Sequence, residues 1–208
     1  MGPPILAASG LRAAVRTFLR LLHLFIVIVS ERRLPHRDVI GHPVFVTFRL
    51  AGSLPRSRFF SGGEINGGRS FVAMDRLLDE ARTGPRYLLV PEVAEAVVAA
   101  LKRGNAVLRH YELGSYVVMP NHVHVLATPR VNRARWLGPL KGFSAHEANR
   151  ILRRSGSVFW QDESYDHLVK SEREFERIQR YIENNPVKAG LVTQAEEFRW
   201  SSAYGATR

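Results

Sequence analysis

The chain contains no cysteine. This absence excludes disulfide bonds, thiolate metal sites and a cysteine nucleophile. Any metal ion would therefore have to be held by histidine, carboxylate or amide side chains. Internal repeats, low-complexity segments and a GxxxxGK[ST] motif are missing as well, so the glycine-rich stretch at 61–70 does not indicate a phosphate-binding loop.

Acidic residues are scarce relative to basic ones. Lys and Arg number 30 against 19 for Asp and Glu, which gives a formal net charge of +11. Arginine supplies nearly all of the positive charge, and its planar guanidinium suits phosphate oxygens and stacks on bases. This balance favours a polyanionic partner, either nucleic acid or an acidic membrane surface. A basic protein from an arginine-rich proteome, without such a partner, is the alternative.

The 208 residues are enough for one domain with an extension. Residues 1–33 differ from the rest, because three arginines precede the apolar run LLHLFIVIVS at 21–30. This order is typical of a signal peptide, but His23 interrupts the run, the run is short for a membrane span, and no small-residue cleavage site follows. We expect either an amphipathic helix packed on the domain or translated sequence upstream of the true start, with a membrane-seeking segment as the third alternative. The domain itself is predicted to span 34–208.

The hydrophobic patterns in this domain predict a mixture of strands and helices. PVFVTFRL at 43–50 is typical of a strand, and residues 110–119 and 122–129 predict a hairpin of two long strands. Helices are predicted over about 71–82 and over 90–104, where Pro91 stands at the first turn.

Two further helices are predicted in the C-terminal half. Residues 131–156 should be mostly helical after a break at Gly138-Pro139. Ser171 and Glu174 match a capping box that opens a helix running to about 184, which Pro186 should end. The expected fold class is α+β, a small domain with an antiparallel sheet and helices on one or both sides.

The predicted strand at 122–129 carries two histidines separated by one valine. Alternate residues of a strand point to the same face, so His122 and His124 should project together while Val123 and Val125 face the other way. Two neutral imidazoles side by side can bind one divalent cation, with further ligands needed to complete the site. Two surface histidines on an exposed strand face would produce the same spacing, so the motif alone is weak.

A second group of polar residues lies near the C-terminus, in RIQRYIENNPVKAGLV at 177–192. Tyr181 falls at the border of an apolar helical stripe, as many boundary tyrosines do. Asn185 is four residues further and would share its face if the helix persisted, but the residue before Pro186 is disfavoured in a helix. Spacing alone does not make either residue catalytic.

In combination, these segments resemble a known family. MPNHVHVLATP, then FWQDESYDHLVKSEREFERIQRYIENNPVKAGLV, then FRWSSAYG resemble the REP-associated tyrosine transposases, which belong with the IS200-like single-tyrosine transposases of the HUH nuclease superfamily. PVFVTFRLAGSLP and LKGFSAHEANRIL add to the resemblance, which covers about 34–205 and leaves the N-terminal 33 residues outside.

The resemblance implies a ferredoxin-like α+β fold with the histidine pair on a central strand. It implies that Tyr181 is the nucleophile and that His122, His124 and Asn185 bind Mg²⁺ or Mn²⁺. The implied reaction cleaves and rejoins single-stranded DNA at palindromic REP-type hairpins through a 5′-phosphotyrosine intermediate, without a small-molecule cofactor. With one tyrosine at the motif position, a two-ended reaction requires two subunits or sequential use of one, so either a homodimer or a monomer is expected. The implied location is the cytoplasm of a bacterium, at the nucleoid.

A basic stretch from 130 to 154 is interleaved with Trp136 and Phe143, a composition that suits single strands, where phosphates are neutralised and unpaired bases stack. A solvated helix face with buried aromatics would look the same. His167 lies in a block similar to the family and either contacts DNA or orders the loop before the last helix, and Tyr165 nearby is the rival nucleophile. The candidate DNA-binding residues are Arg130, Arg133, Arg135, Lys141, Arg150, Arg153, Arg154 and His167.

Three functions remain open from the sequence. The first is an active HUH endonuclease and transposase. The second is a DNA-binding regulator derived from a transposase that has lost catalysis. The third is a metal-dependent hydrolase in which water replaces tyrosine as the nucleophile.

Overall fold

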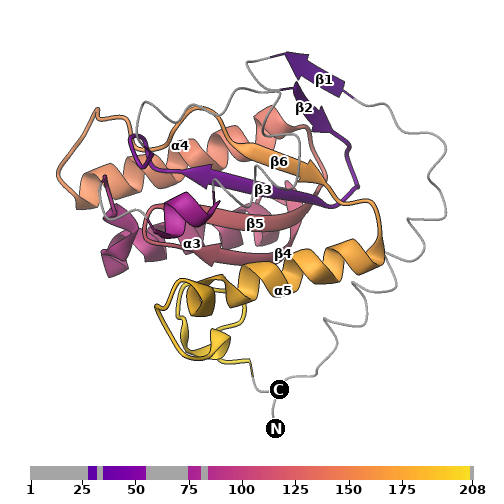
Figure 1. Ribbon diagram of the computed structural model, residues 1–208. Coiled ribbons are helices and arrows are strands. Elements are labelled where there is room, and N and C mark those ends of the chain that lie inside the picture. The colour runs from indigo at the N-terminus through magenta and orange to yellow at the C-terminus, as the bar shows by residue number, and fades with distance from the viewer. Residues whose placement is uncertain (1–27, 32–34, 55–74, 81–83, 207–208) are drawn as a thin grey trace, which may run out of the picture.

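The computed structural model describes residues 28–31, 35–54, 75–80 and 84–206 (Figure 1). The glycine-rich stretch at 61–70 and most of the N-terminal extension lie outside these residues, as do parts of the helix predicted over 71–82. Within the extension, Ile28–Glu31 forms strand β1, which pairs antiparallel with β2, Pro35–Asp38. The end of the apolar run is therefore extended and not helical.

Four strands form the central sheet, in the order β4-β5-β3-β6 (Figure 1). β3 spans Val44–Arg49, β4 spans Tyr111–Val118, β5 spans His122–Pro129 and β6 spans Tyr165–Leu168. Every neighbouring pair is antiparallel. With α3, Pro91–Ala106, between β3 and β4, and α4, Arg133–Ile151, between β5 and β6, the chain follows the β-α-β-β-α-β order of a ferredoxin-like fold, as expected.

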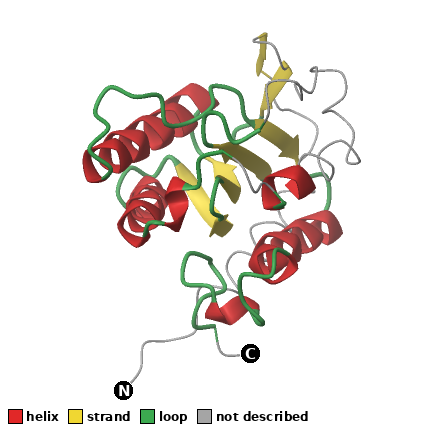
Figure 2. Ribbon diagram, turned by 60° about the vertical axis from the view of Figure 1, so that its left-hand side comes forward, coloured by secondary structure: helices red, strands yellow, loops and turns green. Residues whose placement is uncertain are grey.

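The two faces of the sheet are covered by different helices (Figure 2). Val123 and Val125 of β5 lie in the core cluster that contains the buried residues of α3 and α4. Leu126 lies in a second cluster, with Ile178 and Ile182 of helix α5, Glu172–Lys188. Since alternate residues of β5 face opposite clusters, the predicted period of two is confirmed, and the histidines face the α5 side.

The predicted hairpin and the helix with Pro91 at its start are confirmed, whereas α4, β6 and the end of α5 differ from the prediction. Pro139 does not break α4, which runs continuously from the Asn132 cap. Gly138, Pro139 and Arg135 are exposed, so water can bond the carbonyl of Arg135 that a proline at 139 leaves without a helical donor. Strand β6 was not predicted at all, because its four residues are half-buried and carry mixed polarity.

Helix α5 also continues further than predicted. Ser171 caps it by accepting a hydrogen bond from the Glu174 backbone N–H, while the Glu174 carboxylate bonds Lys170 N and not the cap residue, so the capping box is only half formed. Pro186 lies inside the helix, which ends at Lys188. Pro186 is buried within the helix, although it has no backbone N–H to donate to the preceding turn.

The described residues also contain a short helix at 75–79 and two 3₁₀ helices, η1 (Tyr87–Leu89) and η2 (Ala195–Glu197). The segment after η2 covers the free edge of β4, where Val118 N donates to Trp200 O and Ser202 N donates to Tyr116 O. These bonds satisfy backbone groups that an edge strand would otherwise expose. None of the helices in the described residues is long and apolar enough to span a membrane.

Candidate active site

The histidine pair lies at the centre of the sheet, beneath α5. His122 and His124 are fully buried on β5, and their Nε2 atoms are 3.1 Å apart. The ring centroids are separated by 4.6 Å. Both side chains project from the same face, so the sequence correctly places them together, and a solvent-exposed pair is excluded.

A polar partner holds the Nδ1 atom of each ring. Asn121 Oδ1 lies 2.7 Å from His122 Nδ1, and Thr47 Oγ1 lies 2.7 Å from His124 Nδ1. Asn121 uses its amide nitrogen on the Leu78 carbonyl at 2.9 Å, so its oxygen is the atom that accepts from His122 Nδ1–H. Burial, together with the charge on His124, lowers the pKa of His122 to about 3. His122 is thus neutral at pH 7, and its Nε2 lone pair points into the site.

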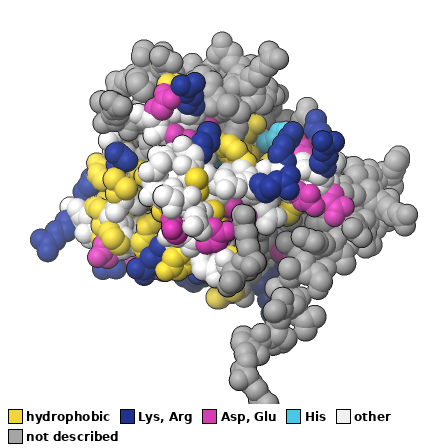
Figure 3. All heavy atoms as spheres, turned by 60° about the horizontal axis from the view of Figure 1, so that its bottom comes forward, with side chains coloured by type: hydrophobic (Ala, Val, Ile, Leu, Met, Phe, Trp, Pro, Cys, Tyr) yellow, Lys and Arg dark blue, Asp and Glu magenta, His cyan; other side chains and the backbone are white. Residues whose placement is uncertain are grey.

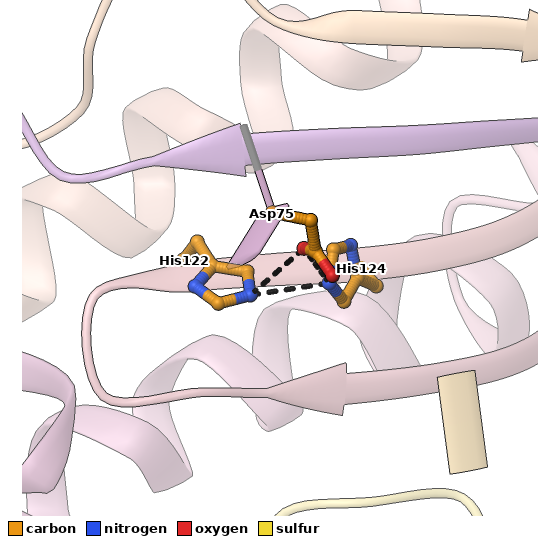
Figure 4. Close-up of side chains that lie close together, drawn as sticks. All are labelled: Asp75, His122 and His124. Atoms are coloured by element: carbon orange, nitrogen blue, oxygen red, sulfur yellow. Dashed lines mark hydrogen bonds and ion pairs between the residues drawn. The ribbon is translucent and has the colours of Figure 1, made fainter. Parts of the chain in front are cut away.

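A carboxylate that we did not predict completes the group. Asp75, in the helix at 75–79, is fully buried, and its Oδ1 lies 3.0 Å from His124 Nε2 and 3.6 Å from His122 Nε2 (Figure 4). The ligand atoms of the three side chains all lie within 4.8 Å of one another. Burial raises the pKa of Asp75, but the charge and hydrogen bond of His124 outweigh burial and hold that pKa well below its ordinary value.

Tyr181 reaches the same group from α5. Its hydroxyl donates a hydrogen bond to Asp75 Oδ2, and its ring packs edge-on against Phe45 and His124, with centroids 6.2 and 5.8 Å away. Burial and the negative charge of Asp75 raise the pKa of Tyr181 far above its ordinary value. The phenol is therefore held protonated, with its proton directed at the carboxylate.

Asn185 lies one turn after Tyr181 on the same helix face, because α5 continues through Pro186. The side chain of Asn185 therefore points to the same side of α5 as that of Tyr181. Its side chain is fully buried, with Nδ2 3.4 Å from both Asp75 Oδ2 and His124 Nε2. The structure thus brings His122, His124, Tyr181 and Asn185 together from β5 and α5, and adds Asp75 from a third element.

The donor atoms of this group fit a divalent cation. Oδ1 of Asp79 and of Asn185 are buried and accept no hydrogen bond within the described part of the chain, and Oδ1 of Asp75 faces the Nε2 atoms of both histidines. Buried acceptors without a partner are rare and cost about 1–3 kcal/mol each. A cation held by imidazole nitrogen and by carboxylate or amide oxygen would satisfy them, and such mixed ligands suit a transition metal such as Mn²⁺, although oxygen-rich sites suit Mg²⁺.

Two charged residues border the group. Asp79 Oδ1 lies 4.0 Å from His122 Nε2, and burial, with the nearby charge of Asp75, raises the pKa of Asp79 to about 7. Lys188 Nζ lies 3.8 Å from Asp75 Oδ2 and 3.9 Å from Asp79 Oδ2. The ammonium of Lys188 is thus close enough to both carboxylates to offset part of their negative charge.

The rival nucleophile, Tyr165, is on β6, separated from β5 by β3. Its ring packs against Phe45 at 6.2 Å, and burial raises its pKa to about 12. The hydroxyl that bonds Asp75 belongs to Tyr181, and this contact distinguishes the two tyrosines.

The candidate DNA-binding residues fall into two groups. Arg133 pairs with Asp166 at 3.1 Å and bonds Ser164, and Lys141 Nζ donates to the carbonyls of Gln161 and Asp162. Both side chains thus tie α4 to the segment that leads into β6. Arg154 stacks on Tyr87, and His167 bonds Glu174 at 3.0 Å.

The remaining candidates are exposed. They are Arg130, which lies 3.7 Å from Glu112, Arg150, which pairs with Glu147, and Arg135 and Arg153. Trp136 is buried, whereas Phe143 is 42% exposed with Arg103 over its ring. On the face shown in Figure 3, Lys and Arg side chains are spread among carboxylates and do not form one continuous patch.

Comparison with known proteins gives a family model and several solved structures. Residues 86–185 match the family model described as "Transposase IS200 like". A structure of a REP-associated tyrosine transposase bound to a REP hairpin aligns over 84% of this chain and 82% of its own, with a TM-score of 0.51 and 18% identity. At that identity the likeness shows the fold alone.

A candidate transposase from Deinococcus radiodurans R1 aligns over 76% of this chain and 98% of its own, with a TM-score of 0.39 and 22% identity. A search of curated proteins finds no match.

Proposed function

We propose that this chain is an IS200-like transposase, a metal-dependent single-strand DNA endonuclease with Tyr181 as its nucleophile. One observation carries the proposal. The Tyr181 hydroxyl meets a buried group of two imidazoles, a carboxylate and an amide, which come from three separate elements. Such a group has the composition of a metal centre beside a nucleophile.

His122, His124, Asp75 and Asn185 would hold the cation. A bound divalent ion would polarise the phosphodiester and offset the charge that develops on it. The neutral Nε2 of His122 and the buried oxygens of Asp75 and Asn185 suit that role, and the Nδ1 partners Asn121 and Thr47 keep both rings oriented. The proposed ion is Mg²⁺ or Mn²⁺.

Tyr181 Oη would attack the phosphorus, and the bond from phosphorus to the 3′-oxygen would break. The products are a 5′-phosphotyrosine and a free 3′-hydroxyl. The phenolic proton departs along the hydrogen bond to Asp75 Oδ2, and the departing 3′-oxygen takes up one proton. The direct hydrogen bond from the phenol to Asp75 Oδ2 allows proton transfer to accompany bond formation. The reverse attack by a 3′-hydroxyl rejoins strands without an external energy source.

The proposed substrate is a single strand folded into a palindromic hairpin. The net charge of +11 favours a polyanion, and the solved relative was bound to a REP hairpin. Exposed arginines such as Arg135 and Arg153 are candidates for phosphate contacts. A protein acting on such DNA would work at the bacterial nucleoid, in the cytoplasm.

The test is covalent capture of DNA. The purified protein is incubated with Mn²⁺ and an end-labelled hairpin oligonucleotide taken from palindromes that flank its gene, and the products are separated under denaturing conditions. We expect cleavage with the downstream fragment attached to the protein through its 5′ phosphate, so a label on the 3′ end of the oligonucleotide should migrate with the protein. Tyr181→Phe should abolish the adduct while hairpin binding remains, and Tyr165→Phe, the matched control, should keep it.

Other outcomes would favour the alternatives. Cleavage without an adduct that survives Tyr181→Phe would indicate a hydrolase that uses water. Salt-sensitive hairpin binding without cleavage under any divalent metal would indicate a DNA-binding regulator.

A further inference from the structure

Lys188 stands two helical turns after Tyr181 and three residues after Asn185, on the same face of α5. Side chains of a helix lean toward its N-terminus, so Lys188 reaches back over this face. Its Nζ lies 5.4 Å from the centre of the Tyr181 ring and 3.8 Å from Asp75 Oδ2. A positive charge is thus placed directly beside the proposed nucleophile.

The lysine differs from its carboxylate neighbours in exposure. Its side chain is 49% exposed, whereas those of Asp75 and Asp79 are 0% and 9% exposed. The ammonium therefore lies at the mouth of the site, between the buried carboxylates and solvent.

The contacts of Lys188 leave its donors available. Its two carboxylate partners are 3.8 and 3.9 Å away, which is longer than a charge-assisted hydrogen bond of about 2.7–2.9 Å. Within the described residues, no side-chain hydrogen bond from Nζ is formed. A flexible four-carbon stem with three donors can turn to a phosphate without breaking a direct bond.

We propose that Lys188 contacts the scissile phosphate of the DNA and holds a non-bridging oxygen while Tyr181 attacks. This inference rests on the proposed function. In-line attack requires the phosphorus to lie about 3–3.5 Å from the tyrosine oxygen. A phosphate at that distance brings its non-bridging oxygens within reach of Nζ, where the ammonium stabilises the added negative charge.

The competing role is structural, in which Lys188 only neutralises Asp75 and Asp79. Such a role predicts that Lys188→Gln weakens folding or cation binding and leaves the electrostatics of DNA binding unchanged. A phosphate contact predicts instead that one counterion fewer is released on binding, which changes the salt dependence.

Four proteins separate these roles: the wild type, Lys188→Gln, Lys188→Arg and Lys102→Gln. Lys102 is an exposed lysine on α3, across the sheet from the site, and is the matched control. For each we measure the single-turnover rate of hairpin cleavage with Mn²⁺, the hairpin affinity from about 50 to 300 mM salt, Mn²⁺ affinity and the melting temperature.

We expect Lys188→Gln to slow cleavage about tenfold or more, as the loss of one transition-state donor does. The slope of log affinity against log salt should become shallower by about 0.7 to 0.9. Lys188→Arg should restore the slope and most of the rate, and Lys102→Gln should resemble wild type in cleavage rate.

A Lys188→Gln variant with the wild-type cleavage rate and salt slope would overturn the inference. So would a loss of Mn²⁺ affinity or melting temperature with an unchanged slope, which indicates the structural role. A wild-type protein that binds the hairpin but never cuts it overturns the proposed function instead, and the salt slope still decides whether Lys188 contacts phosphate.

Discussion

The hydroxyl of Tyr181 donates a hydrogen bond to Asp75 Oδ2, although 106 residues separate the two along the chain. Asp75 meanwhile pairs with His124 through Oδ1 at 3.0 Å. One buried carboxylate therefore connects the proposed nucleophile to the histidine pair. This connection makes Asp75 both a candidate ligand and the group that orients the phenolic proton.

Asp75→Asn should weaken Mn²⁺ binding about 10- to 100-fold, because the substitution removes the negative charge among the candidate ligands and keeps the shape of the side chain. Isothermal titration of the purified protein with Mn²⁺ measures this effect without DNA. Asp162→Asn, at an exposed carboxylate, is the control and should bind Mn²⁺ as the wild type does. Equal Mn²⁺ affinity in Asp75→Asn and wild type would exclude Asp75 as a ligand.

Thr47→Val should also reduce Mn²⁺ affinity, by about tenfold, although Thr47 is not itself a candidate ligand. Its hydroxyl is buried 2.7 Å from His124 Nδ1, and valine has nearly the same shape without the hydrogen bond. Loss of that bond frees the ring to rotate and leaves a buried nitrogen without its partner, at a cost of about 1–3 kcal/mol.

Thr47→Ser keeps the hydroxyl and is the matched variant for this test. Both proteins are titrated with Mn²⁺ and unfolded in urea. If the serine variant loses as much affinity as the valine variant, then packing of the methyl group, and not the hydrogen bond, accounts for the effect.

Local sequence patterns predict much of this fold because alternate residues of a strand face two different cores and the amphipathic helices bury one face each. Alternation in 122–129 correctly predicts that the two histidines share one face and that Val123 and Val125 face the other way, where the structure has the α3–α4 core. Strand β6 could not be predicted in this way, because it is a short strand at the sheet edge whose four residues are all half-buried and show no alternation. Pro139 and Pro186 lie inside helices, one exposed and the other buried, and tertiary context of this kind is not contained in a local propensity.

The candidate site was only partly predictable for a similar reason. His122 and His124 are two residues apart, and Tyr181 and Asn185 are one turn apart, so regular geometry brings each pair together. Asp75 has no such link, since it is 47 positions before His122 and meets it only through tertiary packing. The sequence feature that could have pointed to Asp75 is a second aspartate, Asp79, four residues later on the same predicted helix. Two acidic residues at this spacing are also common on exposed helices, so the feature is weak.

Arg133 and Arg135 should behave differently although both lie in the basic stretch before α4's midpoint. Arg133 is nearly buried between Asp166 and Ser164, whereas Arg135 is exposed. We expect Arg133→Ala to lower the free energy of unfolding by about 3–5 kcal/mol, because Asp166 loses its buried partner. Arg135→Ala should leave stability within about 0.5 kcal/mol and make the salt slope of hairpin binding shallower.

Urea unfolding and hairpin binding of these two variants test the assignment. Arg133→Lys is a third variant, which keeps the charge but not the two-donor geometry, and should recover part of the stability. A stable Arg133→Ala protein with reduced DNA affinity would instead make Arg133 a DNA contact.

Lys141 should make stability depend on pH in the alkaline range. Burial, with the nearby charge of Arg133, lowers the pKa of Lys141 to about 8 in the folded protein, against 10.5 for an ordinary lysine. Between these values the unfolded chain binds more protons than the folded one, so the contribution of Lys141 to the free energy of unfolding rises with pH. Below pH 8 both states hold the proton and the contribution is constant.

The difference in unfolding free energy between wild type and Lys141→Met isolates this effect. Measured in urea at about pH 7, 8.5 and 10, the difference should increase with pH, by less than about 1.4 kcal/mol per unit, because the side chain is not fully buried. Lys170→Met, at an exposed lysine, corrects for the general effect of removing one positive charge. A difference that falls with rising pH would mean that the bonds from Nζ to the carbonyls of Gln161 and Asp162 stabilise the ammonium more than burial disfavours it.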